Sequence, residues 1–302
     1  MHTSPNISNH RKKTTIIRLR IDQTKWWETP MAALIFFTRL PFWRLCSPSK
    51  ACYQHVVEYW PLAGWLTGGI MALTFYITSA WFTLPVAVLL AIIARILTTG
   101  ALHEDGLADF LDGFGGGYNR ERILSIMKDS HIGTYGVLGL ILYFALLATT
   151  LLAIGDHEIT TVTPSFALDN ADSASTLLLA STILAADPFC KMVSGQLIMF
   201  LPYARKEEEA KSKTVYVKYG LQAGLRLALT GLMPLVGWGW MMNQWFAVPF
   251  SSIEVLVAVP CIVFYLLYLL MNRKLQGYTG DCCGATFLLT ELSFYLTFAA
   301  TL

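Results

Sequence analysis

Long apolar runs alternate with short polar connections along most of the chain. The runs are 61–80, 84–102, 134–155, 174–201, 221–242, 250–271 and 284–302. Each is long enough for an α-helix to cross the hydrocarbon core of a bilayer, which takes roughly 20 residues. Because lipid offers no hydrogen bonds to the backbone, such runs form helices. The pattern predicts an all-α, polytopic membrane helix bundle with about seven transmembrane spans.

The chain before the first run has a different pattern, with a shorter apolar stretch and a basic segment. The stretch MAALIFFTRLPFW, at 31–43, has too few apolar residues before Arg39 to cross a bilayer, so it predicts an N-terminal interfacial or re-entrant segment. Residues 1–30 are basic and lack the apolar core of a signal peptide, which predicts a basic N-terminal extension. No internal repeat divides 31–302, so we expect a single integral-membrane domain there.

Composition and charge placement sharpen this picture. Charged residues make up only 14% of the 302 residues, whereas soluble domains carry about 25%. The net charge of +2 is too small to indicate a nucleic-acid partner. Lys and Arg gather at 103–131, 202–220 and 272–283 and are absent from 156–172. The positive-inside rule then predicts that the N-terminus and the basic connections are cytoplasmic.

Carboxylates gather directly after the second apolar run, in ALHEDGLADFLDGFGGGYNRER at 101–122. If the helix of that run continues past the membrane surface, Asp105, Asp109 and Asp112 lie on one face at i, i+4 and i+7, with Glu104 alongside. Neighbouring carboxylates repel unless a cation lies between them. Hard oxygen ligands suit Mg²⁺ or Mn²⁺ better than zinc, so the face predicts a metal site. A solvated acidic helix end is the alternative.

A glycine-rich segment follows the carboxylates. Its glycines are Gly113, Gly115, Gly116 and Gly117. We expect them to end the helix and Asn119 to cap the next one. A glycine-rich turn that runs into a helix N-terminus binds anions, and Arg120 and Arg122 add positive charge. A flexible hinge is the alternative, but a phosphate site beside a metal accounts better for the pattern.

Further charged residues lie outside this segment. Asp281 falls in a tight glycine-rich turn, QGYTGDCCG, where packing does not explain a carboxylate. Within the predicted spans, Asp187 and Lys191 are four residues apart and can form an ion pair on one helix face. Charges inside a membrane are functional candidates, and with Glu254 they leave open a transporter that carries ions.

Several stretches together resemble one known family. TGALHEDGLADFLDGFGGGYNRERILSIMKDSHIGTYG, at 99–136, resembles the signature of the cobalamin synthase family, the adenosylcobinamide-GDP ribazoletransferases. Other landmarks of that family follow in the same order: FFTRLP at 36–41, WPLAGWLTGG at 60–69, LPYAR at 201–205 and GYTGDCCGATFLLTEL at 277–292. The resemblance runs from about residue 31 to the C-terminus and identifies 31–302 as one integral-membrane catalytic domain.

The resemblance implies a Mg²⁺-dependent enzyme of the bacterial inner membrane. It would join adenosylcobinamide-GDP to α-ribazole, or to its 5′-phosphate, and release GMP. The chain departs from the family in two places. His131 stands where the family often has arginine, and DPFCK, at 187–191, stands in a span where we expect an arginine; both leave a basic side chain nearby. Its partners would be these two substrates and the lipid bilayer, with no nucleic acid. A homo-oligomer or a complex with other cobalamin-assembly enzymes stays open.

These interpretations assign roles to individual residues. The expected ligands of Mg²⁺, or of Mn²⁺, are Asp105, Asp109, Asp112 and Glu104. Asp112 is the favoured general base, since it resembles the last acid of the CDP-alcohol phosphotransferase motif; His103 and Asp281 compete with it. The expected phosphate and substrate contacts are Gly113, Gly115, Gly116, Gly117, Arg120, Arg122, Asp129, Arg205 and Arg39. A CDP-alcohol phosphotransferase is the nearer alternative, although Asp109 stands where that motif needs arginine.

Overall fold

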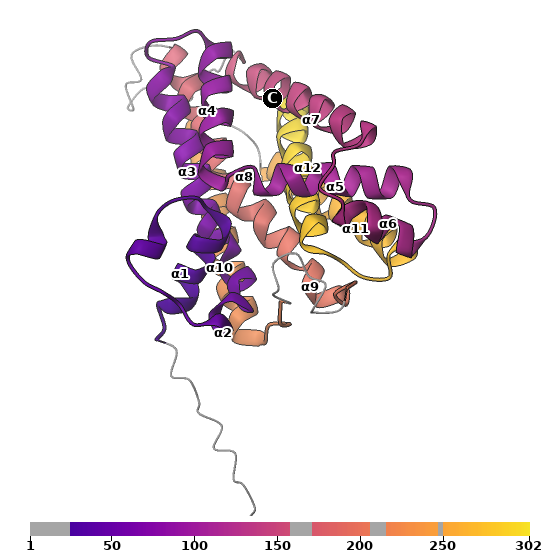
Figure 1. The fold of residues 1–302 in the computed structure, drawn as a ribbon. Coiled ribbons are helices and arrows are strands. Elements are labelled where there is room, and N and C mark those ends of the chain that lie inside the picture. The colour runs from indigo at the N-terminus through magenta and orange to yellow at the C-terminus, as the bar shows by residue number, and fades with distance from the viewer. Residues whose placement is uncertain (1–24, 158–170, 206–215, 247–249) are drawn as a thin grey trace, which may run out of the picture.

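The computed structural model describes residues 25–157, 171–205, 216–246 and 250–302, and these ranges hold helices and no strand (Figure 1). The helices are α1 (Glu28–Phe37), α2 (Lys50–Tyr53), α3 (Trp60–Thr78), α4 (Leu84–Thr99), α5 (Leu102–Gly116), α6 (Arg120–Lys128), α7 (Thr134–Gly155), α8 (Ala171–Gly195), α9 (Leu197–Phe200), α10 (Leu221–Phe246), α11 (Phe250–Lys274) and α12 (Gly280–Thr301), with short 3₁₀ turns η1 (Phe42–Arg44) and η2 (Val56–Tyr59). The predicted all-α membrane bundle is therefore confirmed. Most of the predicted 1–30 extension lies outside the described residues.

Every predicted span coincides with helix. Five helices are long and apolar enough to cross a membrane, namely α3, α7, α8, α11 and α12, and the bent pair α4–α5 makes a sixth. The fifth predicted span became α10, which is not among these six. The structure is thus compatible with seven spans without confirming that number. The predicted interfacial segment forms the short helix α1 and the turn η1.

The second span does not continue straight past the membrane surface, so that prediction is wrong. α4 and α5 meet at an angle of 89°. The cause is the hinge Gly100–Ala101, where both residues adopt the left-handed conformation, with φ of 66° and 57°. Glycine takes this conformation without strain, and a Cβ there would also overlap the side chain of Arg39. α5 consequently lies across the bundle, nearly perpendicular to α3 and α4 (Figure 1).

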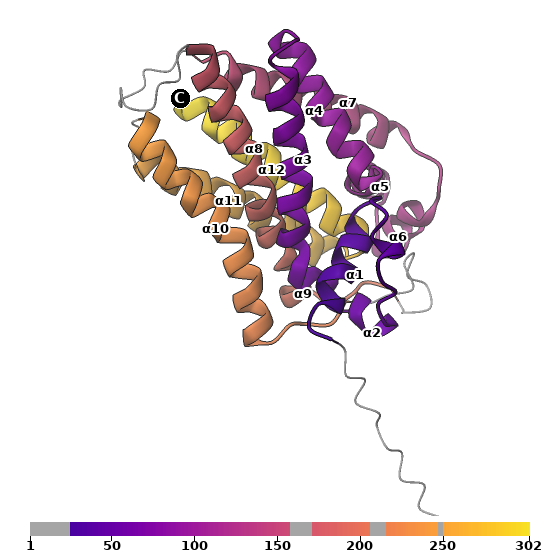
Figure 2. The ribbon, with the colours of Figure 1, turned by 90° about the vertical axis from the view of Figure 1, so that its left-hand side faces the viewer.

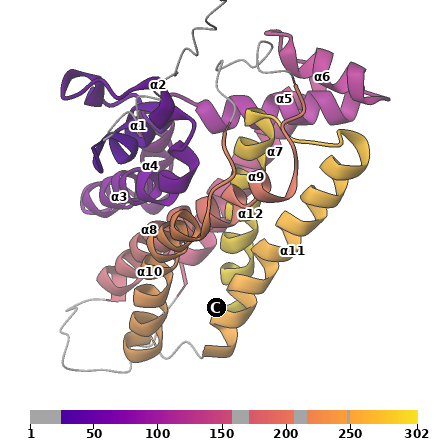
Figure 3. The ribbon, with the colours of Figure 1, turned by 90° about the horizontal axis from the view of Figure 1, so that it is seen from below.

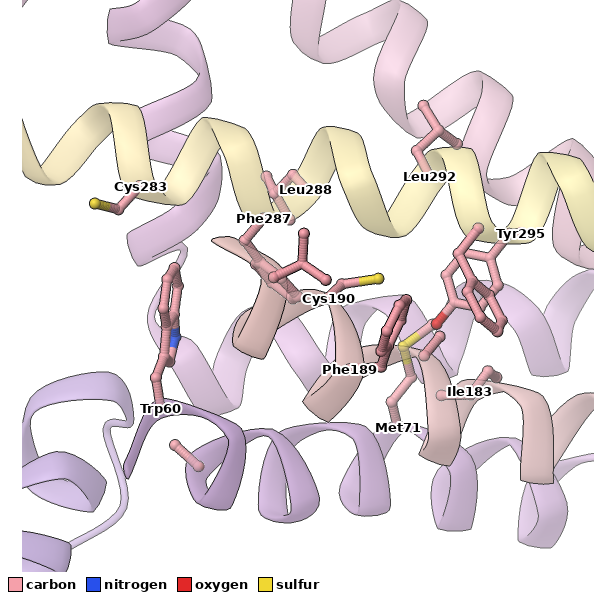
Figure 4. Packing of buried hydrophobic residues seen from close by; sticks show 14 of the residues in the cluster. Trp60, Met71, Ile183, Phe189, Cys190, Cys283, Phe287, Leu288, Leu292 and Tyr295 are labelled. Carbon is pink, nitrogen blue, oxygen red and sulfur yellow. The ribbon is translucent and has the colours of Figure 1, made fainter. Parts of the chain in front are cut away.

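Helices α3, α8 and α12 form the centre of the bundle, and their apolar side chains interlock (Figure 4). Gly64 and Gly68 of α3 allow close approach, since a Cβ on either would lie 2.8 Å from an atom of Asp187. α10 and α11 lie outside this centre (Figure 2). Only 11% of the most apolar part of α11 is buried, against 72% in α8 and α12, so most of the apolar surface of α11 is exposed, as expected of a helix that faces lipid.

The charges within the central helices are paired. The predicted ion pair between Lys191 and Asp187 is present and fully buried. Thr67 of α3 joins it: Lys191 Nζ donates to Thr67 Oγ1 at 2.8 Å, and Thr67 Oγ1 donates to Asp187 Oδ2 at 2.8 Å. A buried pair with this many hydrogen bonds locks α3 against α8. The interpretation of these charges as an ion path loses its support.

Candidate active site

A pocket of about 150 Å³ opens where α5 crosses the start of α12. Its polar lining is His103, Asp105, Arg205 and Asp281, and its aromatic lining is Phe36, Phe37, Trp60, Tyr203 and Tyr216. Figure 3 shows α5 beside the start of α12, with α1 and α2 to one side. Residues from almost the whole length of the chain thus meet at one end of the bundle.

Two glycines make the crossing of α5 and α12 possible. A Cβ on Gly106 would lie 3.0 Å from the carbonyl oxygen of Asp281, and a Cβ on Gly284 would lie 3.3 Å from Cα of His103. Each helix therefore carries a glycine where it touches the backbone of the other. Because Asp105 precedes Gly106, this contact brings the carboxylates of Asp105 and Asp281 to one pocket.

The two pocket carboxylates lie beside a buried cation. Asp105 is exposed, and Asp281 is partly buried and accepts a hydrogen bond from Thr279 Oγ1 at 3.3 Å. Arg205 is 9% exposed, and its Nη2 donates to the carbonyl of Leu124 at 3.2 Å. Two carboxylates and a guanidinium on one pocket are suited to binding a phosphate together with a cation.

His103 lies in an aromatic cage beside these charges. Its ring is 5.8 Å from Trp60 and 6.4 Å from Phe37, both nearly parallel to it, and 4.9 Å from Phe287 in an edge-on arrangement. The side chain is 3% exposed, and its Nε2 has no hydrogen-bond partner among the described residues. Leaving such a group unpaired costs about 1–3 kcal/mol, which a ligand in the pocket could recover.

Asp112 belongs to the same predicted face as Asp105 but is held by backbone. Its Oδ2 accepts from the N–H of Gly133 at 2.7 Å, and its Oδ1 accepts from the N–H of Gly136 at 2.9 Å. These are donors at the start of α7, which the helix itself leaves unpaired. Asp112 therefore anchors α7 to α5, and its predicted roles as metal ligand and base stay predictions.

Glu104 faces the interior of the bundle. One of its oxygens lies 3.9 Å from Arg95 of α4, and the other has no partner among the described residues. Arg95 is itself buried and donates to Glu291 Oε2 at 2.5 Å and to the Tyr143 hydroxyl at 2.9 Å. This cluster joins α4, α5, α7 and α12 beneath the pocket.

Comparison with known proteins identifies the family. A family model described as cobalamin-5-phosphate synthase matches residues 29–299. The chain belongs to the cobalamin synthase family. Curated relatives bear the name adenosylcobinamide-GDP ribazoletransferase. The protein of Shewanella baltica is 33% identical over 88% of this chain and 91% of its own. That of Leptothrix cholodnii is 35% identical over 89% and 93%, and that of Vibrio cholerae 34% identical over 90% and 93%.

The family predicted from the motifs is therefore confirmed, and the chain is an enzyme of cobalamin synthesis, at the assembly of the nucleotide loop. This excludes the transporter and the CDP-alcohol phosphotransferase as its class. No solved structure matches the chain.

In this member of the family the glycine-rich segment is not the predicted turn. α5 continues through Gly113 and Gly115 to Gly116, because side chains of later helices fill the space beside these glycines. A Cβ on Gly113 would lie 2.5 Å from Met127, and one on Gly115 would lie 2.6 Å from the Tyr135 ring. Only Gly117 ends the helix.

The predicted cap of α6 is confirmed, since the side chain of Asn119 accepts a hydrogen bond from the N–H of Arg122 at 2.8 Å. Arg120 donates to the carbonyls of Leu275 at 2.9 Å and Ala204 at 2.6 Å. It therefore ties α6 to the ends of α9 and α11. In the structure the guanidinium of Arg120 therefore binds backbone carbonyl groups.

The other predicted substrate contacts lie away from the pocket. Arg122 is exposed on α6, and Arg39 lies exposed beside Gly100. Asp129 is exposed, and a hydrogen bond from His131, 2.6 Å away, lowers the pKa of its carboxyl group. The described lining of the pocket contains none of these three side chains.

The aromatic lining was missed by the sequence interpretation, although its signal was present. Phe36 and Phe37 belong to FFTRLP, Trp60 begins WPLAGWLTGG, and Tyr203 lies in LPYAR. Four of the five aromatic residues of the lining thus fall within a family landmark, and Tyr216 lies outside them. In an apolar chain, periodicity alone does not separate such residues from lipid-facing or core ones.

The described residues contain no group of three His, Cys, Asp or Glu side chains that could form a complete metal cage. Mg²⁺ does not need one, because it commonly binds one or two carboxylates, substrate phosphates and water. Asp105 is exposed on the pocket. Asp109 follows it one helical turn along, is partly exposed and lies outside the pocket lining. These oxygen donors fit a Mg²⁺ ion that binds together with substrate.

Proposed function

We propose that the chain is a Mg²⁺-dependent adenosylcobinamide-GDP ribazoletransferase, the name that its relatives carry. Its substrates would be adenosylcobinamide-GDP and α-ribazole or its 5′-phosphate. Its products would be adenosylcobalamin, or its 5′-phosphate, and GMP. The observation that carries the proposal is the meeting of Asp105, Asp281 and Arg205 on one pocket at the crossing of α5 and α12.

The reaction is a phosphoryl transfer. A hydroxyl oxygen of the ribazole forms a bond to the phosphorus next to cobinamide, and the bond from that phosphorus to the oxygen of GMP breaks. GMP leaves with the bonding electrons, and the hydroxyl proton passes to a base. We propose Asp281 as the general base, because it lines the same pocket as Asp105.

The charges of the pocket suit the other demands of this reaction. Asp105 and Asp109 would hold Mg²⁺, or Mn²⁺ in its place. The ion, when bound, neutralises the phosphate oxygens and the charge of the leaving group. Arg205, largely buried and fixed by the carbonyl of Leu124, would bind a pyrophosphate oxygen. Asp112 would contribute by holding α7 against α5.

The same proposal places the enzyme in a bacterial inner membrane with its N-terminus and pocket at the cytoplasmic face. In support, Arg273 and Lys274 lie in the last turn of α11 beside α6, and Arg205 lines the pocket. An oligomer or a complex with other cobalamin-assembly enzymes stays a prediction.

The test is GMP release by the purified protein in lipid. Both substrates would be supplied with Mg²⁺, with Mn²⁺ or with a chelator. We expect metal-dependent GMP release and a matching amount of cobamide product. GMP release that continues in the presence of chelator would contradict the proposed requirement for a metal ion. GMP release without cobamide would show hydrolysis in place of transfer.

A further inference from the structure

We infer that the aromatic side of the pocket binds the planar base of the nucleoside acceptor, and that the guanine of the donor binds elsewhere. The inference rests on the proposed function and assigns each substrate its place. The surface concerned, here called the aromatic wall, consists of Phe37, Trp60 and His103. Its ligand would be a benzimidazole-type base, which is flat and mostly apolar.

The geometry of the aromatic wall favours a flat ligand. Its three rings are almost parallel: Phe37 and Trp60 lie 5.3 Å apart at 13°, and Trp60 and His103 lie 5.8 Å apart at 23°. The three residues come from α1, α3 and α5, which the surrounding helices fix. Figure 4 shows Trp60 on the same side of the core as Cys283, another residue that lines the pocket. Aromatic planes held in this way bind another aromatic ring with little loss of freedom.

Two ring nitrogens of the aromatic wall lack a partner. Trp60 Nε1 and His103 Nε2 are buried, and no described residue bonds to either. Buried polar side-chain atoms in proteins are nearly always hydrogen-bonded, so two such atoms on one pocket point to a ligand. An indole N–H can only donate. A benzimidazole base has one free ring nitrogen, which can only accept, and it matches this donor.

Size and polarity argue against the other groups of the two substrates. An engineered cavity of about 150 Å³ in another protein holds one benzene ring, so a pocket of this volume suits a small planar base and not a corrin. Guanine carries N–H donors at N1 and N2, and the apolar rings of Phe37 and Trp60 offer no acceptor for them. If the carboxylates of Asp105 and Asp281 accepted these N–H groups, they would be withdrawn from the phosphates.

The inference also orders the reacting groups. With the nucleobase of α-ribazole on the aromatic wall, its ribose would extend toward the pocket residues Asp105 and Asp281. The attacking hydroxyl would then be next to Asp281, the general base that takes its proton. Tyr203 and Tyr216, which also line the pocket, complete an aromatic surround for the nucleoside.

The experiment compares KM values for the two substrates in Trp60→Phe, which keeps an aromatic ring and removes the N–H. We expect KM for α-ribazole to rise about five- to tenfold, the effect of one hydrogen bond, with KM for adenosylcobinamide-GDP within about twofold of wild type. The matched control is Trp43→Phe, because Trp43 is exposed on η1 and does not line the pocket. A rise in KM for the donor instead would place guanine on the wall. If neither KM rises, the inference is overturned and Trp60 only packs against its neighbours.

A second measurement does not depend on turnover or on the variant. α-Ribazole alone is titrated into wild-type protein by calorimetry, beside an analogue in which CH replaces the free ring nitrogen. We expect the analogue to bind about five- to tenfold more weakly, and Trp60→Phe to remove that difference. Equal binding of both ligands to wild type would overturn the inference. Absence of GMP release with normal α-ribazole binding would overturn the proposed function and leave the base site standing.

Discussion

The two ends of α5 carry the same kind of residue in opposite situations. Asp105 and Asp112 lie on one face of one helix, yet Asp105 is exposed on a pocket, whereas both oxygens of Asp112 accept backbone N–H groups of α7. The first end packs on α12 through Gly106 and the second on α6 and α7. A carboxylate is available for chemistry only where no backbone donor saturates it. α5 therefore has a reactive end, at Asp105, and an anchored end, at Asp112.

The largest effect should come from removing the exposed carboxylate. We expect Asp105→Asn to lower kcat for GMP release by about 10³-fold, because a metal ligand supplies several kcal/mol in the transition state. Insertion and thermal unfolding should match wild type, since the side chain is exposed. Activity within tenfold of wild type at saturating Mg²⁺ would remove Asp105 from the metal site.

The cluster beneath the reactive end should dominate stability. Arg95→Met leaves Glu291 buried without its partner, and we expect the free energy of unfolding to fall by about 3–5 kcal/mol. The double variant Arg95→Met with Glu291→Leu should lose less than Arg95→Met alone, because the buried carboxylate of Glu291 is removed together with its partner. Denaturation of the single and double variants in detergent measures this. Additive losses would mean that the pair does not interact.

At the anchored end we expect a substitution to lower stability and to leave the Mg²⁺ dependence unchanged. Asp112→Asn removes an acceptor from one of two N–H groups at the start of α7, and we expect a loss of about 1–3 kcal/mol in stability. At a temperature where the variant is folded, its dependence on Mg²⁺ concentration should match wild type. A weakened Mg²⁺ requirement with unchanged stability would reverse the roles that we give to the two ends.

Paired glycine substitutions test the two packing surfaces. Gly106→Ala places a Cβ 3.0 Å from Asp281 backbone, which should push α5 from α12 and lower activity about tenfold. Gly116→Ala, at the anchored end, meets only the Ile126 side chain at 3.4 Å. Alanine favours helix by up to about 1 kcal/mol, so Gly116→Ala should keep full activity. Equal activities of the two variants would argue against the crossing as a positioning element.

We expect the smallest effect on activity from a substitution at Asp129, which lies beyond the anchored end of α5. Asp129 is exposed and bonded to its neighbour His131, away from the pocket. We expect Asp129→Asn to change both KM values by less than about twofold, within the range of exposed pairs. A large rise in KM for adenosylcobinamide-GDP would restore the substrate contact that the sequence predicted there.

Local information in the sequence was enough for several features. The apolar runs located the long helices, helix periodicity put Asp105 and Asp112 on one face and paired Asp187 with Lys191, and the residue type predicted the cap at Asn119. Each of these depends on residues a few positions apart, which interact within one helix or at its end.

Features that depend on distant segments could not be predicted in this way. The availability of Asp112 was decided by Gly133 and Gly136, and the helical state of Gly113 by the packing of Met127. The pocket itself required the contact of Gly106 with Asp281. No periodicity within one segment reports such contacts between segments, which form only when the helices cross.

The hinge at Gly100–Ala101 fixes the rotation of α5 as well as its direction. One added residue would turn a helix by about 100°. An insertion at the hinge would then move each side chain of α5 into the place of its successor, so that Glu104 took the outward place of Asp105 and His103 took the inward place of Glu104. Every helix could keep its length and composition while the pocket lost Asp105 and its histidine and the bundle lost a carboxylate beside Arg95. The enzyme therefore tolerates no change of phase at this corner.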